Sequence, residues 1–83
     1  MEFYLKPSAV KDLRDLPAAI QRRIVEKLNF YVHTEDPLVF AKSLRNSNSG
    51  SYRFRIGNYR ATFDVVENRI IILAIEHRKD AYL

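Results

Sequence analysis

The chain of 83 residues contains no cysteine and only two glycines, and it has no long hydrophobic run. The lack of cysteine excludes disulfide bonds, thiolate chemistry and cysteine-based zinc sites, and it suits a cytoplasmic protein. The first ten residues do not have the basic-then-apolar layout of a signal peptide. The longest aliphatic run, Ile70 to Ile75, is too short to cross a bilayer. We therefore expect a soluble, cytoplasmic protein with no membrane partner.

Several chemical motifs are absent as well. The sequence has no Gly-rich phosphate loop, no metal-ligand spacing and no nucleophilic serine motif. This argues against metal-dependent hydrolysis, and we expect neither a metal nor a cofactor. RNA cleavage does not need a metal, because the ribose 2′-OH is a built-in nucleophile. An enzyme then has only to align that hydroxyl, move protons and neutralise the charge that builds up on the phosphorane.

The chain is long enough for one folded domain over residues 1–83, since 47% of its residues are hydrophobic and 12% aromatic. Its periodicity predicts the order β-α-α-β-β-β, an α+β fold in which a two-helix hairpin packs on a mainly antiparallel sheet. Ser8 is expected to cap the first helix, and His33 to interact with the C-terminal dipole of the second. The expected elements are a strand over Met1–Lys6, a helix ending before Pro17, a helix over Pro17–Val32, and strands over Tyr52–Ile56, Tyr59–Val66 and Arg69–Ile75.

The net charge of +4 is concentrated in one segment. Residues 37–63 contain no acidic side chain and five basic ones, namely Lys42, Arg45, Arg53, Arg55 and Arg60. A local basic surface attracts polyanions such as RNA, DNA or an acidic protein. Composition alone would favour the alternative, a solvated face of Lys and Arg that maintains solubility.

The stretch YRFRIGNYR, residues 52–60, predicts a hairpin with a two-residue turn at Gly57-Asn58. The resulting register places Arg55 directly opposite Arg60, with Arg53 on the same face. Like charges opposed across strands are destabilising. Their presence favours an anion site on this face over a chance arginine cluster, although both interpretations stay open at this point.

The C-terminal segment extends the same candidate site. A second turn at Glu67-Asn68 would place Arg60 near Ile75 and bring His77, Arg78 and Tyr82 close to the arginines. Arginine side chains grip phosphate oxygens in bidentate fashion, a tyrosine can stack on a base, and a histidine can carry a proton near neutral pH. Simple packing of Tyr82 and a structural role of His77 at the strand end are the alternatives.

Five stretches of the sequence carry a resemblance to a known family, namely DLRDLP, RIVEKL, DPLVFAKSL, GSYRFRIGNYRATFDV and IEHRKDAY. In order and over essentially the whole chain, they resemble the RelE/ParE toxins of bacterial and archaeal toxin–antitoxin pairs. The resemblance implies a microbial-ribonuclease-like fold and one of two activities. RelE-type members are metal-independent endoribonucleases that cut mRNA in the ribosomal A site and so inhibit translation, whereas ParE-type members poison DNA gyrase. An inactive or non-catalytic nucleic-acid-binding relative is a third alternative.

The resemblance also implies site residues and partners. The positions used by RelE-type enzymes for phosphate binding, proton transfer and base stacking correspond to Arg53, Arg55, Arg60, Arg78 and Tyr82. The best-studied form has lysines where this chain has the first two of these arginines, and a protonated guanidinium is a poor general base. Water or His77 would then accept the 2′-OH proton, or the arginines act by electrostatics and positioning alone. The implied partners are a cognate antitoxin, the ribosomal A site with its 16S rRNA, mRNA, and operator DNA through the antitoxin complex only.

Overall fold

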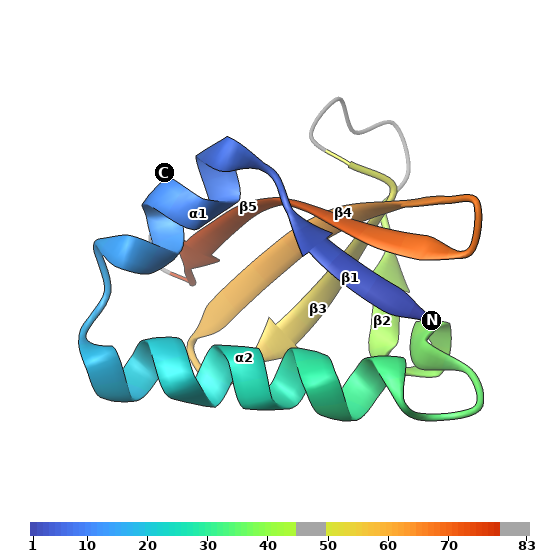
Figure 1. Ribbon diagram of the computed structural model, residues 1–83, viewed down its shortest axis with the longest axis horizontal. Helices are drawn as coiled ribbons and strands as arrows, with labels where there is room; N and C mark the ends of the chain where they lie inside the picture. The colour runs from blue at the N-terminus through green and yellow to red at the C-terminus, as the bar shows by residue number, and fades with distance from the viewer. Residues whose placement is uncertain (45–49, 79–83) are drawn as a thin grey trace.

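A computed structural model describes residues 1–44 and 50–78 of the chain. Its centre is a five-stranded sheet in the order β1-β5-β4-β3-β2, in which only β1 and β5 run parallel (Figure 1). The strands are β1 (Glu2–Leu5), β2 (Ala41–Ser43), β3 (Tyr52–Ile56), β4 (Tyr59–Val66) and β5 (Arg69–His77). The helices are α1 (Pro7–Arg14), α2 (Ala18–Val32) and the 3-10 turn η1 (Pro37–Phe40). This confirms the predicted α+β fold and adds η1 and β2, which were not predicted.

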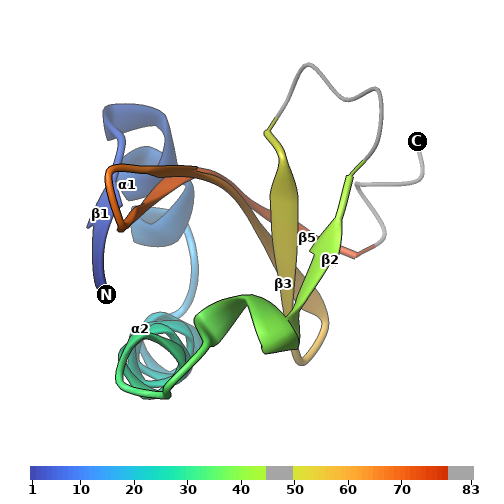
Figure 2. The same ribbon diagram turned by 90° about the vertical axis from the view of Figure 1, so that its right-hand side faces the viewer.

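The hydrophobic core lies between α2 and one face of the sheet. Ile24 and Leu28 of α2 are buried, as are Phe54 of β3 and Phe63 of β4. The rings of Phe54 and Phe63 stack at a centroid distance of 4.3 Å. Figure 2 shows both helices on the same side of β2 and β3, so in the described part of the chain no helix covers the opposite face of these two strands.

The outer edge of β5 is covered first by β1 and then by α1. Beyond β1, the Ser8 hydroxyl donates a hydrogen bond to the Leu73 carbonyl at 2.7 Å, and Asp12 Oδ2 accepts from the Ile75 N–H at 3.0 Å. The prediction that Ser8 caps α1 is therefore wrong. The helix begins at Pro7, whose missing N–H suits a first turn, so the N-cap is Lys6, two residues before Ser8. The Ser8 hydroxyl instead bonds to the edge of β5.

The two predicted turns are present, and the predicted register of the first hairpin is confirmed. Gly57 has φ = 59°, and Asn58 is not among the residues of positive φ, which is the pattern of a type II′ turn. At the second turn Glu67 and Asn68 have φ values of 50° and 65°.

A register shift between Thr62 and Phe63 leaves Leu73 of β5 as an extra residue, so β4 and β5 change register partway along. Strand β5 also continues to His77, two residues past the predicted end. In residues 1–44 and 50–78, no helix is both long and apolar enough to span a membrane.

Candidate functional site

Four cations gather on the face of the sheet opposite the core, and we call them the basic cluster: Lys42, Arg53, Arg55 and Arg60. Lys42 of β2 lies directly opposite Arg53 of β3, and Arg55 of β3 lies directly opposite Arg60 of β4. Together with Phe40 they line a depression of about 230 Å³. The structure therefore brings three of the predicted arginines together.

The alternation of side chains along β3 explains why these arginines share a face. Phe54 and Ile56 are buried against the core, so their neighbours Arg53 and Arg55 must point the other way. Two like-charge pairs side by side each oppose folding by roughly 0.2–1 kcal/mol. The two like-charge pairs therefore lower the stability of the folded protein, and a bound polyanion would offset this loss.

Lys42 and Phe40 were not among the predicted site residues. Phe40 is the last residue of η1, and Lys42 is the middle residue of the three-residue strand β2. A strand this short shows no usable period, and its place beside β3 depends on residues far along the chain. The signal available in the sequence is the order Phe-Ala-Lys at residues 40–42, in which a small apolar residue separates an aromatic residue from a cation.

The predicted position of His77 is wrong. Because of the extra residue in β5, His77 lies opposite Tyr59, and the two rings meet edge to face at 5.0 Å. Tyr59 packs against the core side of the sheet, so His77 shares that side and not the face of the arginines. The residue opposite Arg60 is Glu76 rather than Ile75. The candidate proton carrier is thus separated from the basic cluster by the sheet.

The two remaining predicted residues lie at or beyond the end of β5. The Arg78 backbone N–H donates to the Asn58 carbonyl at 2.7 Å, and the residue is exposed. This bond holds Arg78 beside the β3–β4 turn, at the end of the sheet where Arg55 and Arg60 lie. Tyr82 lies outside the described residues.

The described residues offer no metal-binding group of three His, Cys, Asp or Glu side chains. Burial raises the pKa of the Tyr31 phenol above its ordinary value. This phenol therefore stays neutral at physiological pH, as suits a ring in the core. The chemistry that the basic cluster supports is the binding of anions and the stabilisation of negative charge.

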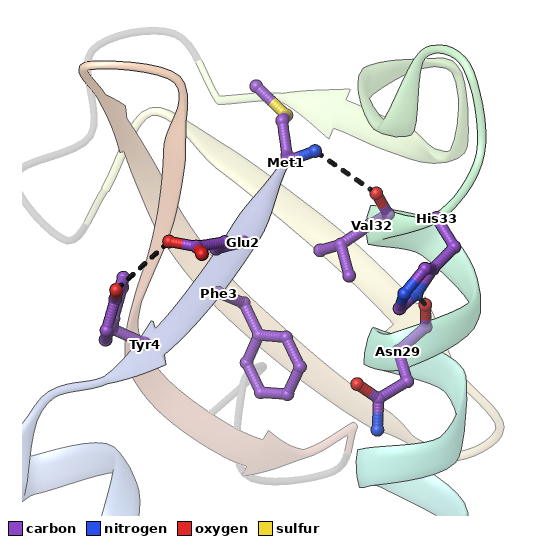
Figure 3. Close-up of a pocket in the computed structure, with 7 residues that line it drawn as sticks. All are labelled: Met1, Glu2, Phe3, Tyr4, Asn29, Val32 and His33. Atoms are coloured by element: carbon purple, nitrogen blue, oxygen red, sulfur yellow. Dashed lines mark hydrogen bonds between the residues drawn. The ribbon is translucent and has the colours of Figure 1, made fainter.

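A second depression lies between β1 and the C-terminal half of α2 (Figure 3). Its polar groups are bonded to one another: the Met1 amino group donates to the Val32 carbonyl at 3.3 Å, and Tyr4 donates to Glu2 at 3.1 Å. His33 Nδ1 lies 2.6 Å from the Asn29 carbonyl oxygen at the end of α2, which agrees with the predicted role at the helix terminus. The described residues that line this depression include no cluster of like charges.

Comparison with known proteins yields a family and several relatives. The family described as ParE toxin of type II toxin-antitoxin system, parDE, matches residues 3–82. Toxin RelE3 of Methanocaldococcus jannaschii is 31% identical over 85 residues, which cover 99% of this chain and 96% of that protein.

Two solved structures share the fold. The toxin–antitoxin complex RelBE2 of Mycobacterium tuberculosis contains a chain with a TM-score of 0.79 and 29% identity, covering 93% of this chain and 96% of that one. A chain of the archaeal RelE–RelB complex of Pyrococcus horikoshii matches with a TM-score of 0.72 and 28% identity, covering 93% of each. The similarity therefore extends over nearly the whole of each protein compared.

Proposed function

Because this chain belongs to the RelE/ParE superfamily and is a toxin of a type II toxin–antitoxin system, we propose that it is an endoribonuclease that cuts mRNA on the ribosome. The observation that carries this proposal is the basic cluster. Four cations from three adjacent strands line one depression, and they form two cross-strand pairs of like charge. An RNA phosphate bound there would relieve the repulsion in both pairs.

In this proposal the arginines act on the scissile phosphate. Their guanidinium groups bind its oxygens in bidentate fashion and stabilise the additional negative charge of the phosphorane. The nucleophile is the 2′-OH of the substrate, so no metal is required. No guanidinium of the cluster is suited to accept the hydroxyl proton. Alignment of the 2′-OH and removal of its proton then depend on water and on groups of the ribosome.

The relatives also support a protein partner. In both solved complexes a RelE protein is bound by its antitoxin. We infer that this chain likewise binds a cognate antitoxin, which covers the basic cluster and blocks access of RNA. Binding of operator DNA would then be a property of the toxin–antitoxin complex.

Poisoning of DNA gyrase is the second candidate function. The specific observation in its favour is that the matching family is described as a ParE toxin. The basic cluster would then contact DNA phosphates or an acidic surface of the enzyme, since electrostatic attraction to polyanions is not selective.

Induction of the protein in cells, with two readouts, separates these functions. We expect new mRNA 5′ ends within codons and an immediate fall in translation, with DNA supercoiling unchanged. An Arg55→Gln variant, which keeps the exposed position but removes the charge, should lose the cleavage. Double-strand DNA breaks with intact mRNA would instead support gyrase poisoning and contradict the ribonuclease proposal.

A further inference from the structure

Phe40 is an exposed aromatic side chain in the wall of the basic depression. It is 44% exposed and lines the depression together with all four members of the basic cluster. It is the last residue of η1 and directly precedes Ala41, which lies opposite Phe54. Phe40 therefore lies next to the start of β2, and it shares the depression with Arg55 of the neighbouring strand.

The ring of Phe40 is held in place from behind. It stacks on Tyr31 at 5.0 Å with an interplanar angle of 27°, and Tyr31 stacks on buried Phe54 at 4.5 Å. Phe30 contacts it edge to face at 5.8 Å. These rings occupy the space on the core side, so Phe40 cannot turn inward. The exposed part of its ring is thus a rigid surface at the outer end of an aromatic stack.

The backbone that carries Phe40 is rigid as well. Pro37 begins η1, and Asp36 Oδ1 accepts a hydrogen bond from the Leu38 N–H at 3.1 Å, which closes the turn. Proline has a fixed φ, and a capped turn has few alternative conformations. The fold therefore presents a large apolar ring to solvent in one orientation, beside the basic cluster.

The composition of the depression indicates what covers this ring. Among the described residues, those that line it besides Phe40 are all lysine or arginine, and none of them is a carboxylate. A nucleotide of single-stranded RNA combines a flat base with an anionic phosphate, and proteins bind such strands with aromatic rings beside cationic grooves. The pairing of one ring with four cations matches that chemistry.

We propose that Phe40 is a stacking platform for one base of single-stranded RNA whose neighbouring phosphate is held by the basic cluster. The inference rests on the proposed ribonuclease function. Because every base has a π face, this contact contributes affinity and alignment rather than sequence readout. It is separate from the stacking role expected for Tyr82.

A fluorescent base tests the proposal without any need for cleavage. The probe is a short single-stranded oligoribonucleotide with 2′-deoxy sugars at the cleavable positions and a central 2-aminopurine, whose emission falls on stacking. The wild-type protein should bind and quench it. Phe40→Leu, which keeps an apolar side chain, should lose the quench and bind about 5- to 100-fold more weakly. Phe40→Trp should retain both properties.

Tyr4→Leu is the matched control. Tyr4 is 48% exposed and has the Arg69 guanidinium 5.7 Å from its ring centre, but it lies on β1 at the other edge of the sheet. Its replacement should change neither affinity nor quench. An unchanged affinity and quench for Phe40→Leu, or no binding by the wild type, would overturn the proposal. So would an equal loss of affinity for a polyglutamate peptide, because a peptide has no base to stack.

The same probe within the A-site codon of programmed ribosomes distinguishes the source of the base. Loss of quench in Phe40→Leu identifies an mRNA base, whereas an unchanged quench with weaker ribosome binding identifies a base of rRNA. Either result supports stacking. A wild-type protein that quenches the oligonucleotide but cuts no mRNA contradicts the ribonuclease proposal alone. Normal cleavage, RNA binding and quench in Phe40→Leu contradict the stacking site alone.

Discussion

Glu76 of β5 lies directly opposite Arg60 of β4, on the face of the sheet that carries the basic cluster. On its other side Arg60 lies opposite Arg55. An opposite-charge cross-strand pair stabilises a sheet by roughly 0.2–1 kcal/mol, and a like-charge pair opposes it by a similar amount. Arg60 therefore takes part in two contributions of opposite sign, and its net effect on stability is small.

Replacement of Arg60 separates stability from activity. Arg60→Thr should change the free energy of unfolding by less than about 1 kcal/mol, because both cross-strand contributions disappear together. Cleavage on programmed ribosomes should fall by about two to three orders of magnitude, the scale for loss of one preorganised charge at a reacting phosphate. Phe54→Ala, at a fully buried position, should instead cost about 3–5 kcal/mol in thermal melts. Wild-type cleavage by Arg60→Thr would show that this arginine is not part of the site.

Removal of the Glu76 carboxylate should strengthen RNA binding. Glu76→Gln leaves the Arg55–Arg60 repulsion without compensation, so stability should decrease by roughly 0.2–1 kcal/mol. The more positive face should bind the oligonucleotide more tightly, with a steeper salt dependence, in titrations at several salt concentrations. Glu67→Gln, at the exposed β4–β5 turn, removes the same charge away from the cluster and should have the smaller effect. Equal changes in RNA affinity for the two variants would show that the net charge of the protein, and not the position of Glu76, causes the effect.

His77 should be dispensable for cleavage. A general acid or base contributes about 10²- to 10⁴-fold to a rate, and His77 lies on the side of the sheet away from the basic cluster. His77→Gln should thus keep the single-turnover rate within about tenfold of wild type and leave its pH profile unchanged. The loss of one limb of that profile would restore His77 as a proton carrier and contradict the placement described above.

The two glycines should differ in their tolerance of a side chain. Both have positive φ, 135° for Gly50 and 59° for Gly57. A Cβ at Gly50 would lie 3.2 Å from Leu73 Cδ1 and 3.3 Å from the Phe63 carbonyl oxygen, whereas at Gly57 the nearest atom is 4.0 Å away. Gly57→Ala should cost about 1–2 kcal/mol for the backbone conformation alone, and Gly50→Ala about 1–3 kcal/mol more from crowding. Urea denaturation of both variants checks this, and equal costs would contradict it.

Asp12 should stabilise the fold through the edge of β5. Asp12→Ala removes the acceptor of the Ile75 N–H, and an unsatisfied N–H at a partly buried site costs about 1–3 kcal/mol. Asp15→Ala, at the exposed end of the same helix, should remain within about 0.5 kcal/mol of wild type. If Asp12→Ala also changes the free energy of unfolding by less than about 0.5 kcal/mol, water replaces the carboxylate as the acceptor of the Ile75 N–H, and the prediction is wrong.

Features that depend on neighbours along the chain could be predicted from the amino-acid sequence. The alternation of residues 52–56 and 59–63 and the short loop at Gly57-Asn58 were sufficient to predict that Arg55 faces Arg60. The reason is physical: side chains alternate with period two along a strand, and a two-residue turn leaves only one register. The amphipathic period of residues 20–31 likewise predicted α2.

Contacts between distant segments could not be predicted in this way, because they depend on how the strands and helices pack. The extra residue at Leu73 exchanged Ile75 for Glu76 opposite Arg60 and moved His77 to the other face, although nothing in the local pattern of β5 marks a bulge. Lys42 and Phe40 joined the site because β2 pairs with β3, and a three-residue strand has too few residues to signal its partner. The position of Phe40 also follows from the aromatic rings behind it, and that packing depends on residues from α2, η1 and β3 at once.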